Sequence, residues 1–338
     1  ENMHKSRQIL LLIGLSLILI LSSCSPANNQ LELAVPINSG NSVSDQNLEN
    51  KDIPSVETNP EPEAIVNPTS LPTDIPNEPT QTAHPDWTAT PDLRLLPHQW
   101  RSWPVVPEIS EFSKKLYLSG IAMGNDPSNF SKIGDCQSQP EVFFGIYDTP
   151  GKFNLNANNQ YLQITLDQYQ GSFSRDSVAV ANGMSVASEF SPLWAHNSAC
   201  QGAETPMQCE NRLHNPSIAI ISLGTNWPSG ALEAFENNLR KIVEYNIAEG
   251  VLPILTTKAD FANEGDLINQ TMAAIAYEFD IPLWNFWRTV QHLPNQGIDP
   301  VESGGSIYLV PAAWDIKSFS GLEILDLVWS TLNDQVPH

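Results

Sequence analysis

From residue 130 onward, short apolar stretches alternate with longer segments whose apolar residues recur at helical spacing. Residues 217–223 form a continuous, β-branched run, which is typical of a strand buried on both faces of a parallel sheet. Further strands are predicted at residues 130–133, 251–256 and 282–287. Helices are predicted at residues 231–248, 266–279 and 321–332.

This alternation of strands and helices predicts an α/β fold, with three α/β/α layers built on a parallel sheet. In such sheets the functional groups gather at the carboxyl ends of the strands. Cys136 and Asn226 each follow a predicted strand. We therefore expect both residues at that edge of the sheet.

The first 24 residues read as an export signal, because His4, Lys5 and Arg7 precede an apolar run over residues 9–21. The run is shorter than the roughly 20 residues that a spanning helix needs. It ends in small residues followed by Cys24, which resembles the lipobox of a bacterial lipoprotein. We expect lipidation of Cys24 and an exported protein anchored to the outer face of the bacterial cell membrane. An ordinary signal peptide with an incidental cysteine and an uncleaved anchor are the alternatives.

Residues 25–97 are predicted to be a tether, since they contain 12 of the 27 prolines and almost no glycine. Such a polar, proline-rich segment buries too little apolar surface to offset the entropy of ordering it. The alternative, a loop packed on the domain, needs about seventy unstructured residues inside a compact body. Residues 98–338 are long enough for one sizeable core, and we predict a single domain there.

The formal charge of −22 argues against nucleic acid or an anionic membrane surface as the main partner. Membrane contact is therefore expected through the lipid anchor only. Cys200 and Cys209 are close in sequence, and an exported chain meets oxidising conditions, so they are predicted to form a disulfide. The alternative, a zinc site, lacks further ligands at suitable spacing. We expect no metal, no cofactor and a monomer, with Cys136 left as the lone thiol of the domain.

The sequence Gly134-Asp135-Cys136, followed about ninety residues later by Gly224 and Asn226, carries the candidate chemistry. It resembles the SGNH (GDSL-like) hydrolase family, whose first block is a strand followed by Gly-Asp-Ser. Cysteine stands here at the serine position. The family's third block, Gly-x-Asn-Asp, is matched in its glycine and asparagine.

Two further positions complete the resemblance, which covers roughly residue 130 to the C-terminus. Gly183 matches the glycine of the family's second block, and Trp227 replaces the aspartate of the third. The resemblance implies an SGNH-hydrolase-like, flavodoxin-like fold, with Cys136 as nucleophile and with Gly183 and Asn226 as donors to an oxyanion. It also implies a glycan or lipid ester as the ligand.

The family's final Asp-x-x-His block, which supplies the base, is not found. Residues 297–309 hold no histidine, their only carboxylates are Asp299 and Glu302, and Ser306 or Tyr308 stands nearest the lost position. Neither a serine nor a tyrosine replaces imidazole near neutral pH. His292 or Asp299 is a candidate base, although His292 also reads as a surface residue at a helix end.

Each candidate has a plainer interpretation. A cysteine after a strand is often a small packing residue, although its thiol, with a pKa near 8.5, gives some thiolate without a base. A charge on Asp135 would oppose that thiolate. Asn226 is also a turn former, and Trp227 and Trp194 serve either as a ligand-binding surface or as packing residues.

Two functional hypotheses follow. The first is an acyl-ester hydrolase or acyl-transfer enzyme acting on glycan or lipid esters. The second is a degenerate domain that binds a carbohydrate or an acylated ligand without turnover, which the missing base favours. A purely structural surface protein is a third alternative, and it predicts no pocket around Cys136.

Overall fold

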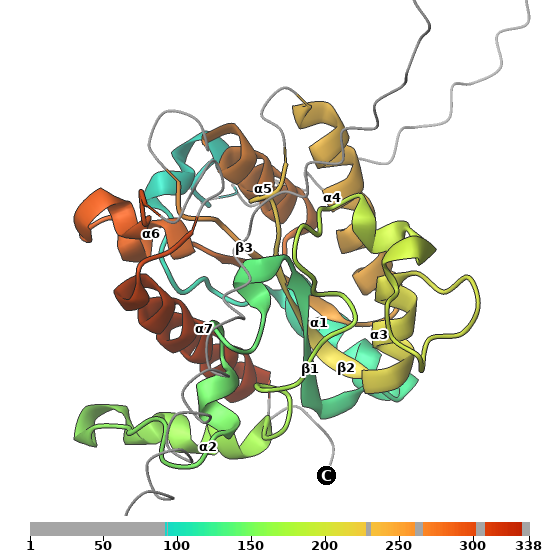
Figure 1. The fold of residues 1–338 in the computed structure, drawn as a ribbon, viewed down its shortest axis with the longest axis horizontal. Helices are drawn as coiled ribbons and strands as arrows, with labels where there is room; N and C mark the ends of the chain where they lie inside the picture. The colour runs from blue at the N-terminus through green and yellow to red at the C-terminus, as the bar shows by residue number, and fades with distance from the viewer. Residues whose placement is uncertain (1–91, 93, 228–230, 261–265, 302–307, 333–338) are drawn as a thin grey trace, which may run out of the picture. The chain divides into compact units, whose positions relative to one another are not determined.

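The computed structural model describes residues 92, 94–227, 231–260, 266–301 and 308–332 (Figure 1). The predicted export signal with Cys24, nearly all of the predicted tether, Glu302 and Ser306 lie outside the described residues. Contacts with the domain are present from Arg94, whose guanidinium donates to the Asp280 carboxylate at 2.8 Å. Among the helices described, none has the length and apolar character needed to cross a membrane.

The core of the domain is a parallel sheet in the order β1-β2-β3-β4. The strands are β1 (Asp126–Gly134), β2 (Pro216–Ser222), β3 (Leu252–Thr256) and β4 (Leu283–Trp284). Gly134 pairs with Ser222 in β2 and also forms a parallel bridge with Val180. Val180 therefore lies on the outer side of β1. Counting it as a minimal second strand gives the order 2-1-3-4-5, which is flavodoxin-like as predicted.

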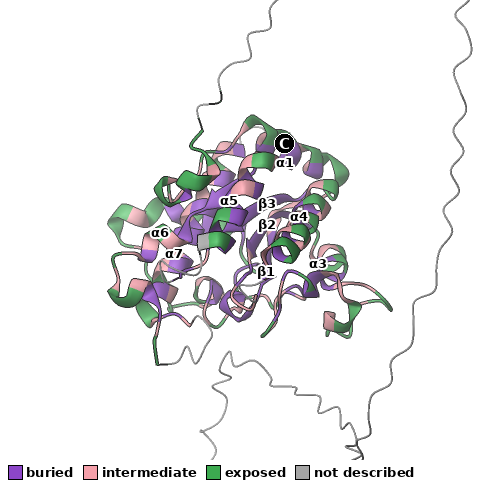
Figure 2. Ribbon diagram, turned by 90° about the horizontal axis from the view of Figure 1, so that it is seen from above, coloured by how far each residue is buried: buried purple, intermediate pink, exposed green. Residues whose placement is uncertain are grey.

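Helices cover both faces of the sheet, because successive side chains of a strand point to opposite sides. Ile218 and Ile220 of β2 belong to one apolar cluster with α1 (Glu111–Met123) and α7 (Pro311–Leu332). Ala219 and Ile221 belong to the other, with α4 (Leu232–Ala248) and α5 (Asp266–Phe279). Figure 2 shows the buried strands between helices whose outer faces are exposed. The predicted three-layer α/β/α fold is confirmed.

Shorter elements connect these layers. The remaining α-helices are α2 (Gln163–Gln168), α3 (Pro206–His214) and α6 (Phe286–Val290). The 3-10 helices are η1 (Pro97–Ser102), η2 (Cys136–Ser138), η3 (Gly145–Asp148), η4 (Ala157–Leu162), η5 (Ser188–Phe190), η6 (Pro192–Trp194) and η7 (Pro294–Gly297).

The strand predicted at residues 282–287 is shorter than expected. Only Leu283–Trp284 pairs with β3, and α6 begins at Phe286. Asn285 ends the strand because its side chain accepts a hydrogen bond from the Arg288 N–H, which caps the new helix. The mostly apolar segment 282–287 does not by its pattern show where extended backbone gives way to a helix.

The last helix begins at Pro311 rather than at residue 321, where it was predicted to start. Gly321 lies inside α7, and a Cβ there would stand 2.8 Å from the Phe144 ring. Glycine is therefore needed at this position for close packing of the helix, and it marks no helix end.

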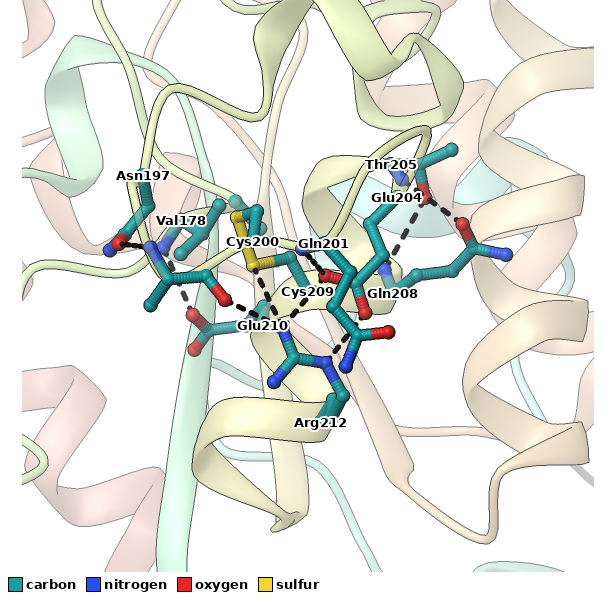
Figure 3. Close-up of a disulfide and its surroundings, with 12 residues drawn as sticks. Val178, Asn197, Cys200, Gln201, Glu204, Thr205, Gln208, Cys209, Glu210 and Arg212 are labelled. Carbon is teal, nitrogen blue, oxygen red and sulfur yellow. Dashed lines mark hydrogen bonds and ion pairs between the residues drawn. A yellow bond between two sulfur atoms is a disulfide. The ribbon is translucent and has the colours of Figure 1, made fainter.

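The predicted disulfide between Cys200 and Cys209 is present and joins a loop to the first turn of α3 (Figure 3). The two sulfur atoms are bonded to each other, so they are not thiolate ligands for a metal. Beside them Arg212 donates to Glu204 at 2.6 Å and to the Ala199 carbonyl at 2.9 Å. The loop is thus held to α3 both covalently and by charge.

Replacing both Cys200 and Cys209 with alanine is expected to lower the free energy of unfolding by about 2 to 3 kcal/mol, because a loop of this length gains conformational entropy in the unfolded chain. Urea denaturation of the variant and the wild type measures the difference. An unchanged denaturation midpoint would show that the Arg212 contacts alone hold this loop.

Candidate functional site

Three loops meet at the carboxyl edge of the sheet. The first follows β1, the second contains Val180 and Gly183, and the third follows β2. The Gly134 N–H donates to the Ala179 carbonyl at 2.8 Å, which joins the first loop to the second. A Cβ on Gly134 would lie 2.1 Å from the Ser138 hydroxyl. The tight turn after β1 therefore requires glycine at this position.

Asp135 is fully buried and organises this turn. Its side chain accepts a hydrogen bond from the Gln137 N–H at 3.0 Å, which caps η2. Burial raises the pKa of Asp135, and this effect outweighs the hydrogen bond from Gln137 and the charge of Lys317. The other carboxyl oxygen of Asp135, Oδ2, is buried without a hydrogen-bond partner among the described residues.

Cys136 lies at the start of η2 with only 4% of its surface exposed. Its sulfur is disulfide-bonded in this structure. The expectation that Cys136 is the lone thiol of the domain is therefore wrong here. A disulfide sulfur carries no thiolate, so an attack by Cys136 on an ester first requires reduction.

The two predicted oxyanion donors lie on neighbouring loops. Gly183 is exposed and has a φ of 77°, which lies in the left-handed region that favours glycine. The Asn226 side-chain amide is half-buried and donates to the Met184 carbonyl at 3.2 Å. This bond uses one of the two amide hydrogens and leaves the other for a ligand. The oxyanion role of both residues stays a prediction.

The two tryptophans flank these donors. Trp227 is half-buried, its indole N–H donates to the Ala231 carbonyl at 2.9 Å, and its ring packs against Phe235. The edge of the Trp194 ring lies 3.8 Å from the point where a Cβ on Gly183 would stand. Both rings are therefore near the Gly183 and Asn226 loops, and their part in ligand binding stays a prediction.

The candidate bases lie on the chain between α6 and α7. His292 is exposed in the turn after α6 and makes no hydrogen bond or ion pair within the described residues. Asp299 accepts a hydrogen bond from the Val301 N–H at 2.9 Å, and its own N–H donates to the Tyr308 carbonyl at 2.8 Å. These bonds fold the chain around Asp299, and the catalytic roles of His292 and Asp299 stay predictions.

Two buried charged residues near the site were not predicted from the sequence. Lys317 of α7 donates to the Gln137 carbonyl at 2.8 Å and to the Ser222 hydroxyl at 3.2 Å, and burial lowers its pKa to about 8. Its spacing from Ala313 and Gly321 places it on the apolar stripe of the helix, which is a signal that the sequence does carry. Glu189 of η5 is fully buried as well, and no local pattern marks it.

Comparisons with known proteins concern the fold. No family model matches this sequence, and no curated protein is recognisably similar to it. A solved structure of a G-D-S-L family lipolytic protein from Desulfitobacterium hafniense is similar at 16% identity and a TM-score of 0.37, covering 58% of this chain and 99% of that one.

Two more solved structures are similar at the same level. One is a psychrotrophic esterase from a Pseudoalteromonas species, inhibited by monoethylphosphonate, at 14% identity and a TM-score of 0.40, covering 61% of this chain and 99% of that one. The other is a GDSL-like lipase from Bacteroides thetaiotaomicron, at 14% identity and a TM-score of 0.35, covering 67% of this chain and 100% of that one. This chain is similar in fold to these proteins, two of which are described as G-D-S-L or GDSL-like, and the likeness says nothing about its substrate.

Proposed function

We propose that the domain binds an acyl ester of a glycan or a lipid at the carboxyl edge of its sheet and does not turn it over. A lipid anchor on Cys24 would hold that sulfur in a thioether and so leave Cys136 as a thiol, and the tether would display this site at the bacterial surface. The binding function rests on the residues that line the three loops.

The observation that carries the proposal is the missing base, since residues 297–309 hold no histidine. Cys136, the predicted nucleophile, is buried, with 4% of its surface exposed. The described part of the final block adds Asp299 and Tyr308, and neither side chain replaces imidazole as a base for a hydroxyl or thiol at neutral pH.

A second function, a thiol esterase active after reduction, is favoured by the contact between the Asn226 amide and the Met184 carbonyl. This contact joins the third loop to the residue after Gly183, as an oxyanion site requires. Reduction of the Cys136 disulfide separates the two functions experimentally.

The first measurement is hydrolysis of 4-nitrophenyl butyrate by the purified chain, with and without a phosphine reductant. We expect no release of nitrophenolate above the buffer rate under either condition, because the site has no imidazole base to activate the Cys136 thiol. The Cys136→Ala variant, assayed under both conditions, is the blank.

Two results would contradict this expectation. Turnover by the oxidised wild type that the alanine variant lacks would overturn the binding function. Turnover that appears only after reduction and disappears in Cys136→Ala would establish the thiol esterase. A Cys200→Ala, Cys209→Ala variant controls for reduction of the second disulfide.

Replacing Asn226 with alanine is expected to weaken binding of 4-nitrophenyl butyrate to the oxidised protein about tenfold, because one hydrogen bond to the ester carbonyl is lost. Quenching of the fluorescence of Trp194 and Trp227 by the nitrophenyl group measures the affinity. The matched control is Asn238→Ala, a half-buried asparagine of α4 whose amide donates to the Ala234 carbonyl. Equal affinities for the two variants would remove Asn226 from the binding site.

A further inference from the structure

Lys317 is a charged residue in an apolar interior. It stands in the second turn of α7 with 1% of its surface exposed. Its ammonium lies 4.9 Å from the centre of the Phe143 ring, 5.7 Å from that of Phe286 and 5.9 Å from that of Trp314. The ring faces attract a cation, so the aromatic surroundings partly compensate for the water that Lys317 has lost.

The two hydrogen bonds of this ammonium join two of the three loops. Gln137, whose carbonyl accepts at 2.8 Å, follows Cys136 in η2. Ser222, whose hydroxyl oxygen accepts at 3.2 Å, is the last residue of β2 and precedes the Asn226 loop. A single side chain of the last helix thus holds the turn of the candidate nucleophile against the strand that carries the candidate oxyanion donor.

Asp135 is the charged group that faces Lys317. Each acts on the other through space, and Asp135 also organises the turn from inside by accepting from Gln137. Exchanging a buried ion for an apolar residue of similar size often stabilises a protein. A lysine at this position is therefore hard to explain by stability alone.

We propose that Lys317 is a positioning residue that sets the distance between the η2 turn and the end of β2, and that ligand affinity depends on this distance. The dependence of ligand affinity on this distance rests on the proposed function. The positioning of the η2 turn by Lys317 concerns the free protein and is testable without a ligand.

Lys132 of β1 is a matched control within the same chain. It is as buried as Lys317, burial likewise lowers its pKa to about 8, and its ammonium donates to the Phe173 carbonyl at 2.9 Å. The Lys132→Met variant therefore removes an equally desolvated ammonium that does not bond to η2.

The test is hydrogen exchange of the Gln137, Ser138 and Gln139 amides, all of which donate within the turn. We expect Lys317→Met to speed their exchange tenfold or more and Lys132→Met to leave it unchanged, with urea denaturation recording the global stability of both. Because opening the turn returns the Lys317 ammonium to water and its pKa toward the usual value, the protection of these amides in the wild type, corrected for intrinsic exchange, is expected to rise as pH rises above about 8. That rise should be absent in Lys317→Met and present in Lys132→Met.

Ser222→Ala keeps the test decisive if Lys317→Met does not fold, since it removes one of the two bonds and leaves the charge in place. We expect it to speed exchange of the same amides about threefold. Exchange that is unchanged in both Lys317→Met and Ser222→Ala, or equally faster in Lys317→Met and Lys132→Met, would overturn the positioning role. Affinity for 4-nitrophenyl butyrate is measured on the same variants. A wild type that does not bind it would defeat the proposed function and leave the exchange result standing.

Discussion

Replacing Arg175 with methionine is expected to lower the free energy of unfolding by about 3 to 5 kcal/mol, because it leaves a buried carboxylate without its counter-charge. Glu210 of α3 is fully buried. Both terminal nitrogens of the Arg175 guanidinium donate to its carboxylate. The Ser131 hydroxyl donates to it at 2.6 Å and the Val178 N–H at 3.0 Å.

The pKa of Glu210 explains the size of this effect. Burial raises the pKa, but the hydrogen bonds and charge of Arg175, together with Ser131 and Val178, outweigh burial and hold it below its usual value. The contribution of the pair is therefore complete above the pKa of the unfolded chain and is lost as pH falls through the lowered value. We expect the difference between variant and wild type to shrink in acid.

Urea denaturation at pH 7 measures the effect, and Arg240→Met is the matched control. Arg240 is paired with the partly exposed carboxylates of Glu236 and Glu278, and a surface pair of this kind contributes at most about 1 kcal/mol. Should Arg175→Met cost no more than Arg240→Met, the Glu210 pair does not hold the segment that leads to Val180 and the Gly183 loop.

Replacing Glu189 with glutamine is expected to stabilise the domain by about 3 kcal/mol at pH 6.5 and to change little at pH 4.5. Glu189 is fully buried, and neither of its carboxyl oxygens has a hydrogen-bond partner among the residues that the structure describes. Burial raises its pKa well above the usual value, and the nearby carboxylates of Glu210 and Asp135 raise it further. The folded chain therefore holds Glu189 as the neutral acid.

The stabilising direction of this substitution follows from the unfolded chain, in which a glutamate ionises near pH 4.3. Below that pH both states carry the proton, so the acid adds no pH-dependent cost. As pH rises toward the folded pKa, folding must take up a proton, at a cost of about 1.4 kcal/mol per pH unit. Glutamine has nearly the same shape and takes up no proton, so it removes this cost.

Thermal or urea unfolding at the two pH values measures the difference. Glu244→Gln, at an exposed position of α4, is the control and is expected to stay within about 0.5 kcal/mol of wild type at both. A stabilisation by Glu189→Gln that is equal at pH 4.5 and pH 6.5 would show that ionisation is not its cause. Glu189 thus lowers the free energy of unfolding and lies near a second buried acid, Asp135. Buried acids that destabilise a fold in this way are found at functional sites.

The regular elements were predictable wherever the apolar pattern is local. The run over residues 217–223 differs from β2 by one residue at each end, and the periodic segment 266–279 coincides with α5. Burial of one face requires these patterns, so they are visible in the sequence. The boundaries failed where a single contact decides them, as with the cap formed by Asn285 and the packing of Gly321 against Phe144.

The loops of the candidate site were predictable from the sequence, but the buried charged side chains around these loops were not. Strand-end positions follow from topology, so Cys136 and Asn226 were expected at the same edge of the sheet. The burial of Cys136 and of the charged side chains around its turn depends on contacts with distant segments, and spacing does not encode those contacts.

By itself, the sequence determined the layers of the domain, the Cys200–Cys209 disulfide and the three loops that carry the motif residues, because short-range pattern and spacing specify these features. Only the tertiary structure decided that Lys317, Glu189 and Glu210 are buried beneath those loops. The loss of water and the choice of partner that control a charge arise from contacts between distant segments, such as the bond from Lys317 to the carbonyl of Gln137 180 residues earlier.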